Sequence, residues 1–375
     1  MPKPTPSSLA PFKLRCRLCN QPVDWPPVVP RCPRPSCRGP LQPRTNIQFD
    51  PSLIEPLQPG MWRYQHMLPP LPAHPVHLGE GFTPLLADQV GSLQVYYKNE
   101  SLNPTGSYKD RGAALLINTI GEATVVIDDS SGNAGAGLAA YAARAGVEAR
   151  IFVPAYAPPA KKTQIQRYGA QLFSVEGTRA DVALAAEQAA LEPGVFYASH
   201  VWHPGYALAM QTIAWEIWEQ MGGRAPDWVV LPAGNGSLLR GIRWGFRSLE
   251  KGKWIRTLPR LVAVQPVNCA PLYALSQGAY VPETFQTLPT IADGVAIAHP
   301  PLVEAMWAAV RKTKGQVVVV TEDEIRASQS DLARRGFFVE PTAALPFAAL
   351  PQLEATIPPE DTLVLILTGH GFKSI

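Results

Sequence analysis

Asn99-Glu-Ser-Leu-Asn-Pro-Thr-Gly-Ser-Tyr-Lys-Asp-Arg-Gly112 is the stretch of the chain that says most about its fold. Pro104 and Gly106 predict a tight turn between a strand at 95–98 and the helix that follows. Lys109 would then lie at the N-terminus of that helix, an electropositive place that favours a neutral, nucleophilic amine able to capture an aldehyde. A solvated surface lysine is the ordinary alternative, and this stretch alone does not decide between the two.

On both sides of this turn, short apolar runs alternate with helical patterns. The runs at 124–127 and 149–153 are each followed by a helical pattern, and the alternation resumes at 228–231 and continues to 363–367. Strands that alternate with helices predict an α/β fold in which parallel sheets carry helices on both faces.

A second turn, Asp129-Ser-Ser-Gly-Asn-Ala-Gly-Ala-Gly137, joins a strand to an alanine-rich helix. Such a turn presents backbone N–H groups to an anion, for example a substrate carboxylate near Ser130 and Ser131. Asn133 is placed to donate a hydrogen bond to an oxygen on an aromatic ring. The glycines are equally explained by close helix packing.

A third turn, Pro232-Ala-Gly-Asn-Gly-Ser-Leu-Leu-Arg-Gly241, follows the strand at 228–231. Its glycines allow close approach of the backbone, and the helix that begins near Ser237 directs N–H groups at whatever lies there, which suits a phosphate. A dinucleotide-binding turn is the competitor, but its third glycine would fall on position 239, which is leucine. We therefore predict a seat for one phosphate, formed by Gly234, Asn235, Gly236, Ser237 and Leu238.

The last apolar run ends at Thr368-Gly-His-Gly371. A hydroxyl just beyond a buried strand can meet a pyridine nitrogen and, unlike an acidic residue, does not keep that nitrogen protonated. A simple strand-to-turn glycine pair is the alternative.

Together these four stretches resemble the tryptophan-synthase-β-like superfamily of pyridoxal-phosphate (PLP) enzymes of fold type II, and within it the threonine synthases, over roughly residues 79–373. The resemblance implies that Lys109 carries PLP as a Schiff base, that Asn133 faces the ring 3′-oxygen and that Thr368 meets the pyridine nitrogen. It places the cofactor phosphate on the turn at 234–238. It also implies a large lobe from residues 46–112 and 208–375, and a small mobile lobe from residues 113–207.

The reaction implied by the resemblance converts O-phosphohomoserine and water to threonine and phosphate. One stretch departs from the family's pattern: His203-Pro-Gly-Tyr-Ala-Leu-Ala-Met-Gln-Thr212 lacks the cations expected there for the substrate phosphate. Ser130, Ser131, Lys161 or Lys162 are candidates to replace them. Two alternatives stay open: a β-eliminating enzyme acting on serine or threonine, and a catalytically silent PLP-binding protein whose N-terminal module docks a partner.

That N-terminal module, residues 1–45, contains Cys16, Cys19, Cys32 and Cys37. Two thiolate pairs on neighbouring turns suit a tetrahedral zinc ion, which would stabilise a segment too small for a core. Two disulfides or unligated thiols are the alternative. The proline-rich residues 47–78 predict an extended connection to the main body.

Composition narrows the class of function. The formal charge is +3, and the basic residues are scattered along the chain, so no cluster of positive charge indicates a nucleic-acid-binding surface. No apolar run approaches the roughly 20 residues that a membrane-spanning helix needs. The first residues lack the apolar core of a signal peptide. We therefore expect a cytoplasmic protein that acts on a small amino acid and can form a homodimer.

Overall fold

The predicted apolar runs form parallel strands in two sheets, one in each lobe of a computed structural model that describes residues 12–44, 48–155 and 159–374. The larger sheet has the strand order β12-β11-β10-β13-β5-β4. Its strands are β4 (Leu85–Val90), β5 (Leu93–Asn99), β10 (Trp228–Pro232), β11 (Arg260–Pro266), β12 (Gln316–Val320) and β13 (Thr362–Leu367). All neighbours are parallel except β4 and β5, which pair antiparallel at one edge.

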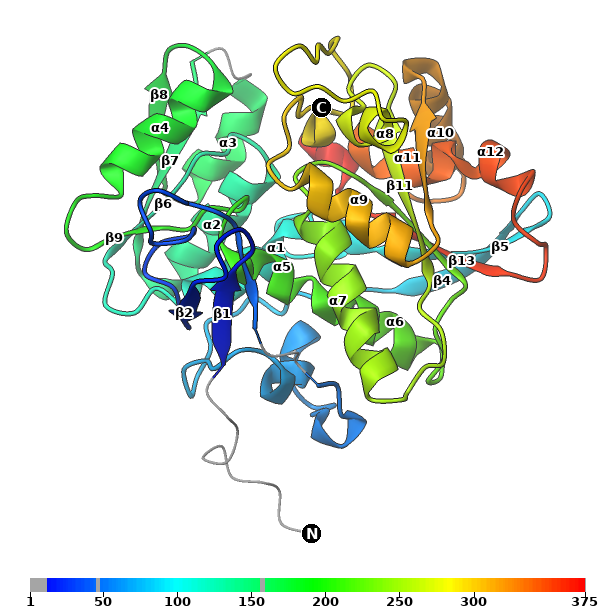
Figure 1. Ribbon diagram of the computed structural model, residues 1–375, viewed down its shortest axis with the longest axis horizontal. Coiled ribbons are helices and arrows are strands. Elements are labelled where there is room, and N and C mark those ends of the chain that lie inside the picture. Colours follow the sequence, from blue (N-terminus) through cyan, green and yellow to red (C-terminus); the bar gives the residue numbers. More distant parts are fainter. Residues whose placement is uncertain (1–11, 45–47, 156–158, 375) are drawn as a thin grey trace.

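The smaller sheet has the order β8-β7-β6-β9 and is parallel throughout. Its strands are β6 (Val125–Asp128), β7 (Glu148–Pro154), β8 (Gln171–Val175) and β9 (Val195–Tyr197). Figure 1 shows this lobe on the left and the lobe of the larger sheet on the right. Every residue of β6 and β10 is buried, as expected for parallel strands covered on both faces.

Helices cover both sheets. The α-helices are α1 (Lys109–Ile117), α2 (Asn133–Ala145), α3 (Pro159–Arg167), α4 (Arg179–Ala189), α5 (Pro204–Ala209), α6 (Gln211–Gln220), α7 (Ser237–Lys251), α8 (Pro271–Ser276), α9 (Val303–Lys312), α10 (Glu322–Arg334), α11 (Pro341–Ala348) and α12 (Leu350–Glu354). Short 3₁₀ helices are η2 (Pro51–Leu53), η3 (Gly60–Met67), η4 (Glu100–Leu102), η5 (Asp293–Val295) and η6 (Gly371–Ser374). No helix in the described ranges is long and apolar enough to cross a membrane.

The extended connection predicted for residues 47–78 is wrong over η3. Its proline-rich flanks are irregular, but η3 buries Trp62 and Tyr64 in the main core. The indole N–H of Trp62 donates to Glu80 at 2.6 Å, and the Tyr64 hydroxyl donates to Glu219 at 2.6 Å. Burial of two aromatic side chains outweighs the extended preference that the neighbouring prolines indicate.

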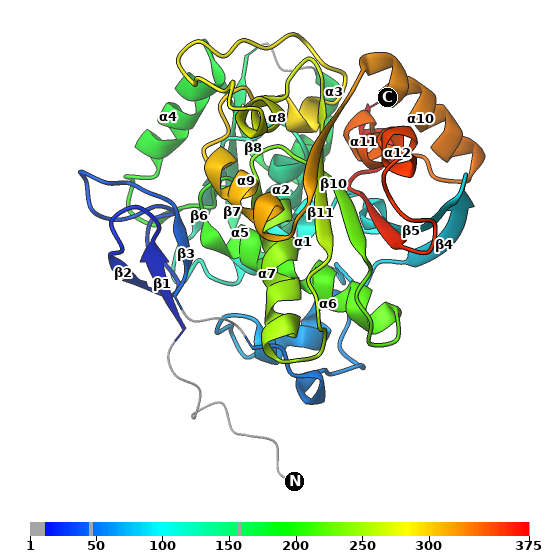
Figure 2. The same cartoon turned by 45° about the vertical axis from the view of Figure 1, so that its right-hand side comes forward.

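The N-terminal module contains a small antiparallel sheet of β1 (Lys13–Cys16), β2 (Pro22–Asp24) and β3 (Leu41–Pro43), in the order β2-β1-β3. Its buried apolar core consists of Leu14, Cys16, Cys32 and Leu41. Figure 2 shows this sheet outside both larger sheets. Arg31 and Arg38 both pair with Glu187 on α4, which attaches the module to the small lobe.

A buried ion network fixes the start of α1. Arg111 donates to Glu100 through Nε at 2.7 Å and through Nη2 at 2.6 Å, and it also pairs with Glu216. Lys98 pairs with Glu216 at 2.7 Å, and the side chains of all four residues are fully buried. Two cations and two carboxylates balance one another, so the network holds α1 without leaving a charge unpaired.

Candidate active site

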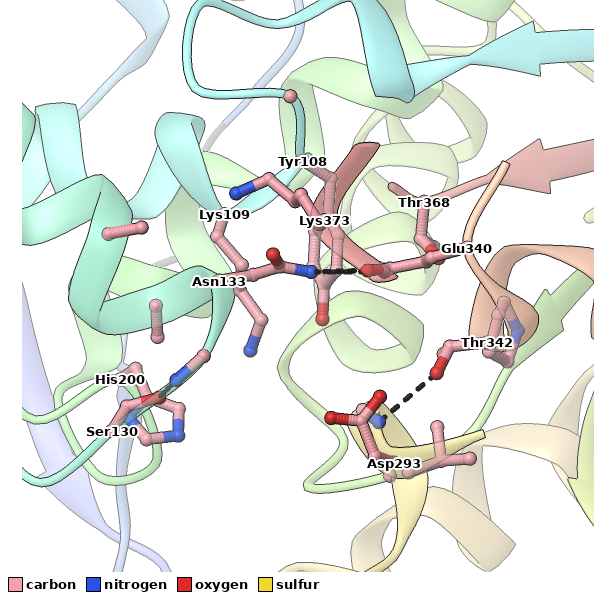
Figure 3. A pocket seen from close by; sticks show the side chains of 18 of the residues that line it. Tyr108, Lys109, Ser130, Asn133, His200, Asp293, Glu340, Thr342, Thr368 and Lys373 are labelled. Atoms are coloured by element: carbon pink, nitrogen blue, oxygen red, sulfur yellow. Dashed lines mark hydrogen bonds between the residues drawn. The ribbon is translucent and has the colours of Figure 1, made fainter. Parts of the chain in front are cut away.

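A cavity of about 1000 Å³ lies between the two lobes, and its wall includes every residue predicted to bind the cofactor together with Ser130 and Ser131, two of the candidates for the substrate. Its wall includes Lys109, Ser130, Ser131, Asn133, Gly234, Asn235, Gly236, Ser237, Leu238 and Thr368. Figure 3 shows Lys109 and Asn133 on one side, with Glu340 and Thr368 opposite. Residues that are far apart in the sequence therefore meet at one site.

Lys109 is the first residue of α1. Gly106 turns the chain with a φ of 85°, a left-handed conformation that favours glycine. The amine Nζ lies over the rings of Tyr108 and Tyr206, at 5.2 and 5.7 Å from their centroids. It makes no hydrogen bond within the described part of the chain, and its side chain extends into the cavity (Figure 3). The structure thus places an amine without a hydrogen-bond partner where the sequence predicts the cofactor lysine.

The predicted phosphate seat joins β10 to α7. Gly236 is the N-cap of α7 and has a φ of 94°. A Cβ atom at this glycine would lie 2.8 Å from Cγ of Met306, so a side chain would not fit there. The first turn of a helix has backbone N–H groups without intrahelical partners. Ser237 and Leu238 of this first turn line the cavity, so the turn can offer donors to an anion.

Thr368 follows directly after β13, near the centre of the larger sheet. Its hydroxyl Oγ1 is buried and has no hydrogen-bond partner among the described residues. Buried polar atoms in native structures are nearly always hydrogen-bonded, and this hydroxyl belongs to a residue of the cavity wall, so it can accept a hydrogen bond from a ligand there or donate one to it. The backbone carbonyl of Thr368 accepts from the N–H of Tyr108 at 3.1 Å, which places the threonine beside the lysine turn.

Asn133 begins α2, as predicted, and its side chain contacts the opposite wall. The amide nitrogen donates to both carboxylate oxygens of Glu340, at 3.0 and 3.1 Å. Glu340 precedes α11 and is buried. In this structure the amide is therefore held by a carboxylate, and its contact with a ring oxygen stays a prediction.

Two cations in the wall were not predicted from the sequence. Lys373 in η6 donates to Gln164 at 2.7 Å, and Arg179 begins α4. Burial lowers the pKa of Lys373, while the negative charges of Glu340 and Asp110 oppose that shift. Lys373 could have been predicted from its position five residues after Thr368, because a residue that contacts the cofactor brings its neighbours in the sequence to the same cavity.

The stretch 203–212 does not form the cavity wall. It makes up α5 and the start of α6, and its residues are buried against α1 and α7. The Tyr206 hydroxyl donates to the backbone carbonyl of Lys109 at 3.2 Å, so this stretch helps to hold the backbone of Lys109 in place. Lys162 donates to the carbonyl of Ala155 and is not among the lining residues described, and the side chain of Lys161 lies outside the described part.

Two buried acids lie close to the cavity. Burial raises the pKa of Asp110 to about 7, although the N–H and hydroxyl of Thr105 both donate to its carboxylate and lower the pKa. Burial would also raise the pKa of Asp128, but the His200 ring, whose Nδ1 lies 3.0 Å away, brings it below its ordinary value. His200 lines the cavity, so the hydrogen-bonded pair of His200 and Asp128 borders the space available to a substrate.

The residues of the cavity fit PLP in chemical type. An amine without a hydrogen-bond partner, a buried hydroxyl without a partner and a glycine-lined helix N-terminus match its aldehyde, its pyridine nitrogen and its phosphate. The three features line the same cavity, which is the arrangement that a single bound cofactor requires.

The four N-terminal cysteines form a separate cluster. Sγ of Cys16 lies 3.6 Å from Sγ of Cys37, and Sγ of Cys19 lies 3.6 Å from Sγ of Cys32. All four sulfur atoms lie within 4.8 Å of one another, and none is in a disulfide. The disulfide alternative is therefore wrong for this structure.

Comparison with known proteins agrees with this site. Residues 76–369 match the family model described as pyridoxal-phosphate dependent enzyme. The chain is 32% identical to threonine synthase of Methanosarcina acetivorans over 96% of its length and 92% of that protein's. It is 35% identical to threonine synthase of Synechocystis sp. over 80% and 78% of the two chains.

Solved structures give the same fold. The crystal structure of the T.th. threonine deaminase matches 77% of this chain and 92% of its own, with a TM-score of 0.65 and 28% identity. The family resemblance predicted from the sequence is confirmed, as is the α/β fold. The chain belongs to the family of pyridoxal-phosphate-dependent enzymes.

Proposed function

We propose that this enzyme is a threonine synthase, a PLP-dependent lyase that converts O-phosphohomoserine and water to threonine and phosphate. The observation that carries this proposal is a PLP-type cavity whose wall also holds two cations, Lys373 and Arg179, that the cofactor contacts do not use. Relatives named threonine synthase match almost the whole chain, including its N-terminal part.

The proposed roles follow from the cavity. Lys109 holds the cofactor through Nζ and later moves the proton at the substrate's α carbon. The seat at Gly236 and Ser237 binds the cofactor phosphate, and Thr368 orients the ring through its nitrogen. When bound, PLP supplies an electron sink for negative charge developing at the substrate. The turn at Ser130 and Ser131 binds the substrate carboxylate at the N-terminus of α2.

We assign the substrate phosphate to Lys373 and Arg179, with Ser130 and Ser131 nearby in the same wall. A dianion needs charge-assisted donors, and these side chains supply the cations that the stretch 203–212 lacks. Because 203–212 is buried beneath α1, its composition does not weaken this assignment.

Steady-state assays on the PLP-loaded enzyme test the function. We expect phosphate release from O-phosphohomoserine to exceed turnover of serine and threonine at equal concentration. The β-eliminating alternative is favoured by the fold of a threonine deaminase, which shares this architecture. Equal or faster deamination of serine and threonine would establish that alternative instead, and no turnover of any of the three would favour a silent PLP-binding protein.

Zinc in the N-terminal module is a second part of the proposal. A tetrahedral site with Zn–S bonds of about 2.3 Å has sulfur–sulfur edges of about 3.8 Å. The two closest sulfur pairs here are each 3.6 Å apart, close to that edge. We expect metal analysis to find one zinc per chain and none in a variant with Cys19 and Cys32 both changed to Ser. An equal zinc content in the two proteins contradicts this assignment.

We also propose that residues 113–207 move as a small lobe over the body formed by 46–112 and 208–375. The division is supported by the two separate sheets, since β6 to β9 share no strand with the larger one. Small-angle scattering of the PLP-loaded enzyme is expected to show a smaller radius of gyration with O-phosphohomoserine than without it. The cytoplasmic location and the homodimer stay predictions, the latter open to sedimentation analysis.

A further inference from the structure

We propose that a second cavity, between the N-terminal module and the large lobe, binds a small metabolite that carries a diphosphate or triphosphate group. We name this cavity the basic groove. It has a volume of about 580 Å³ and lies against β1, α7 and α9. That volume is within the usual range of roughly 300–1,000 Å³ for small-molecule sites. Its wall includes Arg15 and Arg17 from the N-terminal module, Arg240, Arg243 and Trp244 from α7, and Lys312 from α9.

The charge of the groove is one-sided. Seven of its lining side chains are Arg or Lys, and none of the described lining residues is acidic. Arg247 is partly neutralised by Glu250, which accepts its hydrogen bond at 2.8 Å just outside the wall. So many like charges in one concave surface repel one another, and an anion of several charges is the ligand that relieves this repulsion.

The strongest indication is Arg240, in the first turns of α7. The residue is only 6% exposed, and its Nη2 is buried without a hydrogen-bond partner in the described ranges. The guanidinium lies over the Trp244 ring, 4.7 Å from its centroid, which fixes its orientation. Burial, and then the charge of Arg17, lower the pKa of Arg240 to about 10. A buried cation without a counterion is costly unless a ligand supplies one.

Arg243, one helical turn further on, shows the same deficit. Its Nε is also buried without a partner in the part of the chain described. Burial, followed by the charge of Arg247, lowers the pKa of Arg243. Two guanidinium groups on one helix face, each with an unused donor, suit neighbouring phosphoryl groups because their planar forks bind such oxygens in pairs. A single phosphate would leave most of the seven cations unmatched.

The groove is distinct from the catalytic cavity, since the two share no lining residue. Arg15 and Arg17 come from the N-terminal module, whereas Arg240 belongs to α7, which begins at the predicted cofactor phosphate seat. A ligand in the groove therefore contacts both the module and the helix that holds the cofactor. This site does not depend on which amino acid the enzyme converts.

Calorimetric titration of the PLP-loaded enzyme with inorganic triphosphate tests the proposal. We expect one triphosphate per chain, with binding that weakens as salt is added. Arg240→Met and Arg17→Gln should each weaken binding roughly tenfold to hundredfold, the cost of one charge-assisted partner. Arg256→Gln, an exposed arginine outside the groove, and Lys373→Gln, in the catalytic cavity, should leave binding unchanged.

Several outcomes decide the matter. Absence of triphosphate binding overturns the proposal, and so does binding that weakens with Lys373→Gln but not with Arg17→Gln. Tighter binding of poly-glutamate peptide than of triphosphate assigns the groove to an acidic protein segment and also overturns it. ATP that binds as tightly as triphosphate, or more tightly, supports the proposal and identifies nucleotides as a source of the phosphate chain. Arg17 is exposed, so its variant remains informative if Arg240→Met fails to fold.

Discussion

Lys109 and Arg111 lie two residues apart at the start of α1, yet their side chains have opposite surroundings. The Arg111 guanidinium is fully buried and is covered by Glu100, Glu216 and Thr212. The Lys109 amine reaches the cavity and makes no hydrogen bond in the described part of the chain. Arg111 stabilises the fold, whereas Lys109 is available to a ligand. Thr368 and Arg240 resemble Lys109, because each lines a cavity and has a polar atom without a hydrogen-bond partner among the described residues.

The variant Lys109→Ala gives the most direct test of the proposed difference between Lys109 and Arg111. We expect loss of the covalent link to PLP and a fall in turnover of roughly 10²–10⁴-fold or more, because proton transfer at the substrate is lost with it. Stability should change little, since the amine makes no hydrogen bond with the described residues and only distant contacts with the rings of Tyr108 and Tyr206. Borohydride reduction of the wild-type enzyme followed by peptide mass analysis checks the link, and Lys253→Ala serves as the control. Cofactor trapped on any other lysine contradicts the assignment.

The variant Glu216→Gln tests the structural role of the buried ion network around Arg111. We expect a loss of roughly 3–5 kcal/mol in the free energy of unfolding, because two buried cations, Arg111 and Lys98, would then face a single carboxylate. Glu219→Gln on the same helix is the matched control. Glu219 also pairs with an arginine, Arg63, but its side chain is 25% exposed, so the loss should be smaller. Urea unfolding measures both, and a larger loss for Glu219→Gln would show that the network does not hold α1.

The variant Lys373→Gln tests whether Lys373 binds the substrate phosphate. Loss of one charge-assisted partner should raise KM for O-phosphohomoserine by roughly tenfold to hundredfold. Turnover of unphosphorylated serine or threonine should scarcely change, and Lys373→Arg should retain most of the wild-type KM. Steady-state kinetics with both substrate classes checks this. An equal effect on all substrates would assign Lys373 to the structure of η6 and not to the phosphate.

The smallest expected effect concerns His203, a buried group outside both sites. Burial lowers its pKa to about 3 from an ordinary value of 6.5, so the folded protein holds the ring neutral. Its contribution to stability is therefore complete above about pH 6.5 and is lost as pH falls from there towards 3. The slope is at most about 1.4 kcal/mol per pH unit.

His203→Asn should flatten this part of the stability curve. Asparagine does not titrate, and its side-chain oxygen can accept from the N–H of Gly205 at the start of α5, as the Nδ1 of His203 does at 3.1 Å. Urea unfolding between pH 4 and 7 measures the slope, with the exposed His299→Asn as control. A slope unchanged in His203→Asn but flattened in His299→Asn contradicts the prediction.

The sequence was most informative where local chemistry is demanding. The turns that contain Lys109, Asn133, Gly236 and Thr368 each combine a glycine with a residue of distinctive chemistry, and all four of these residues line the cavity. It was least informative where a role depends on distant partners. Nothing near Arg111 indicates that Glu216, 105 residues away, will neutralise it, and nothing near Arg240 indicates that Arg17 will face it.

The same reason explains the remaining errors. The helix η3 forms because Trp62 and Tyr64 find acceptors on Glu80 and Glu219, which local composition does not reveal. The stretch 203–212 was expected at the substrate because of a family pattern, but the fold places it in the core. The number of cations in one segment does not predict the charge of the substrate site when residues from other segments, such as Lys373, also line the cavity.

The place of β13 in the larger sheet also sets an order of events during synthesis. The strand lies between β10 and β5, although it comes later in the chain than the other strands of this sheet. While the ribosome is still adding residues before 362, β5 and β10 each have an open edge where β13 belongs. Open, apolar edges promote aggregation, and pairing of such distant segments is slow. We therefore expect the nascent chain to be prone to aggregation until Thr362–Leu367 emerges, and we expect the predicted contact of Thr368 with the cofactor to form only after that segment has paired.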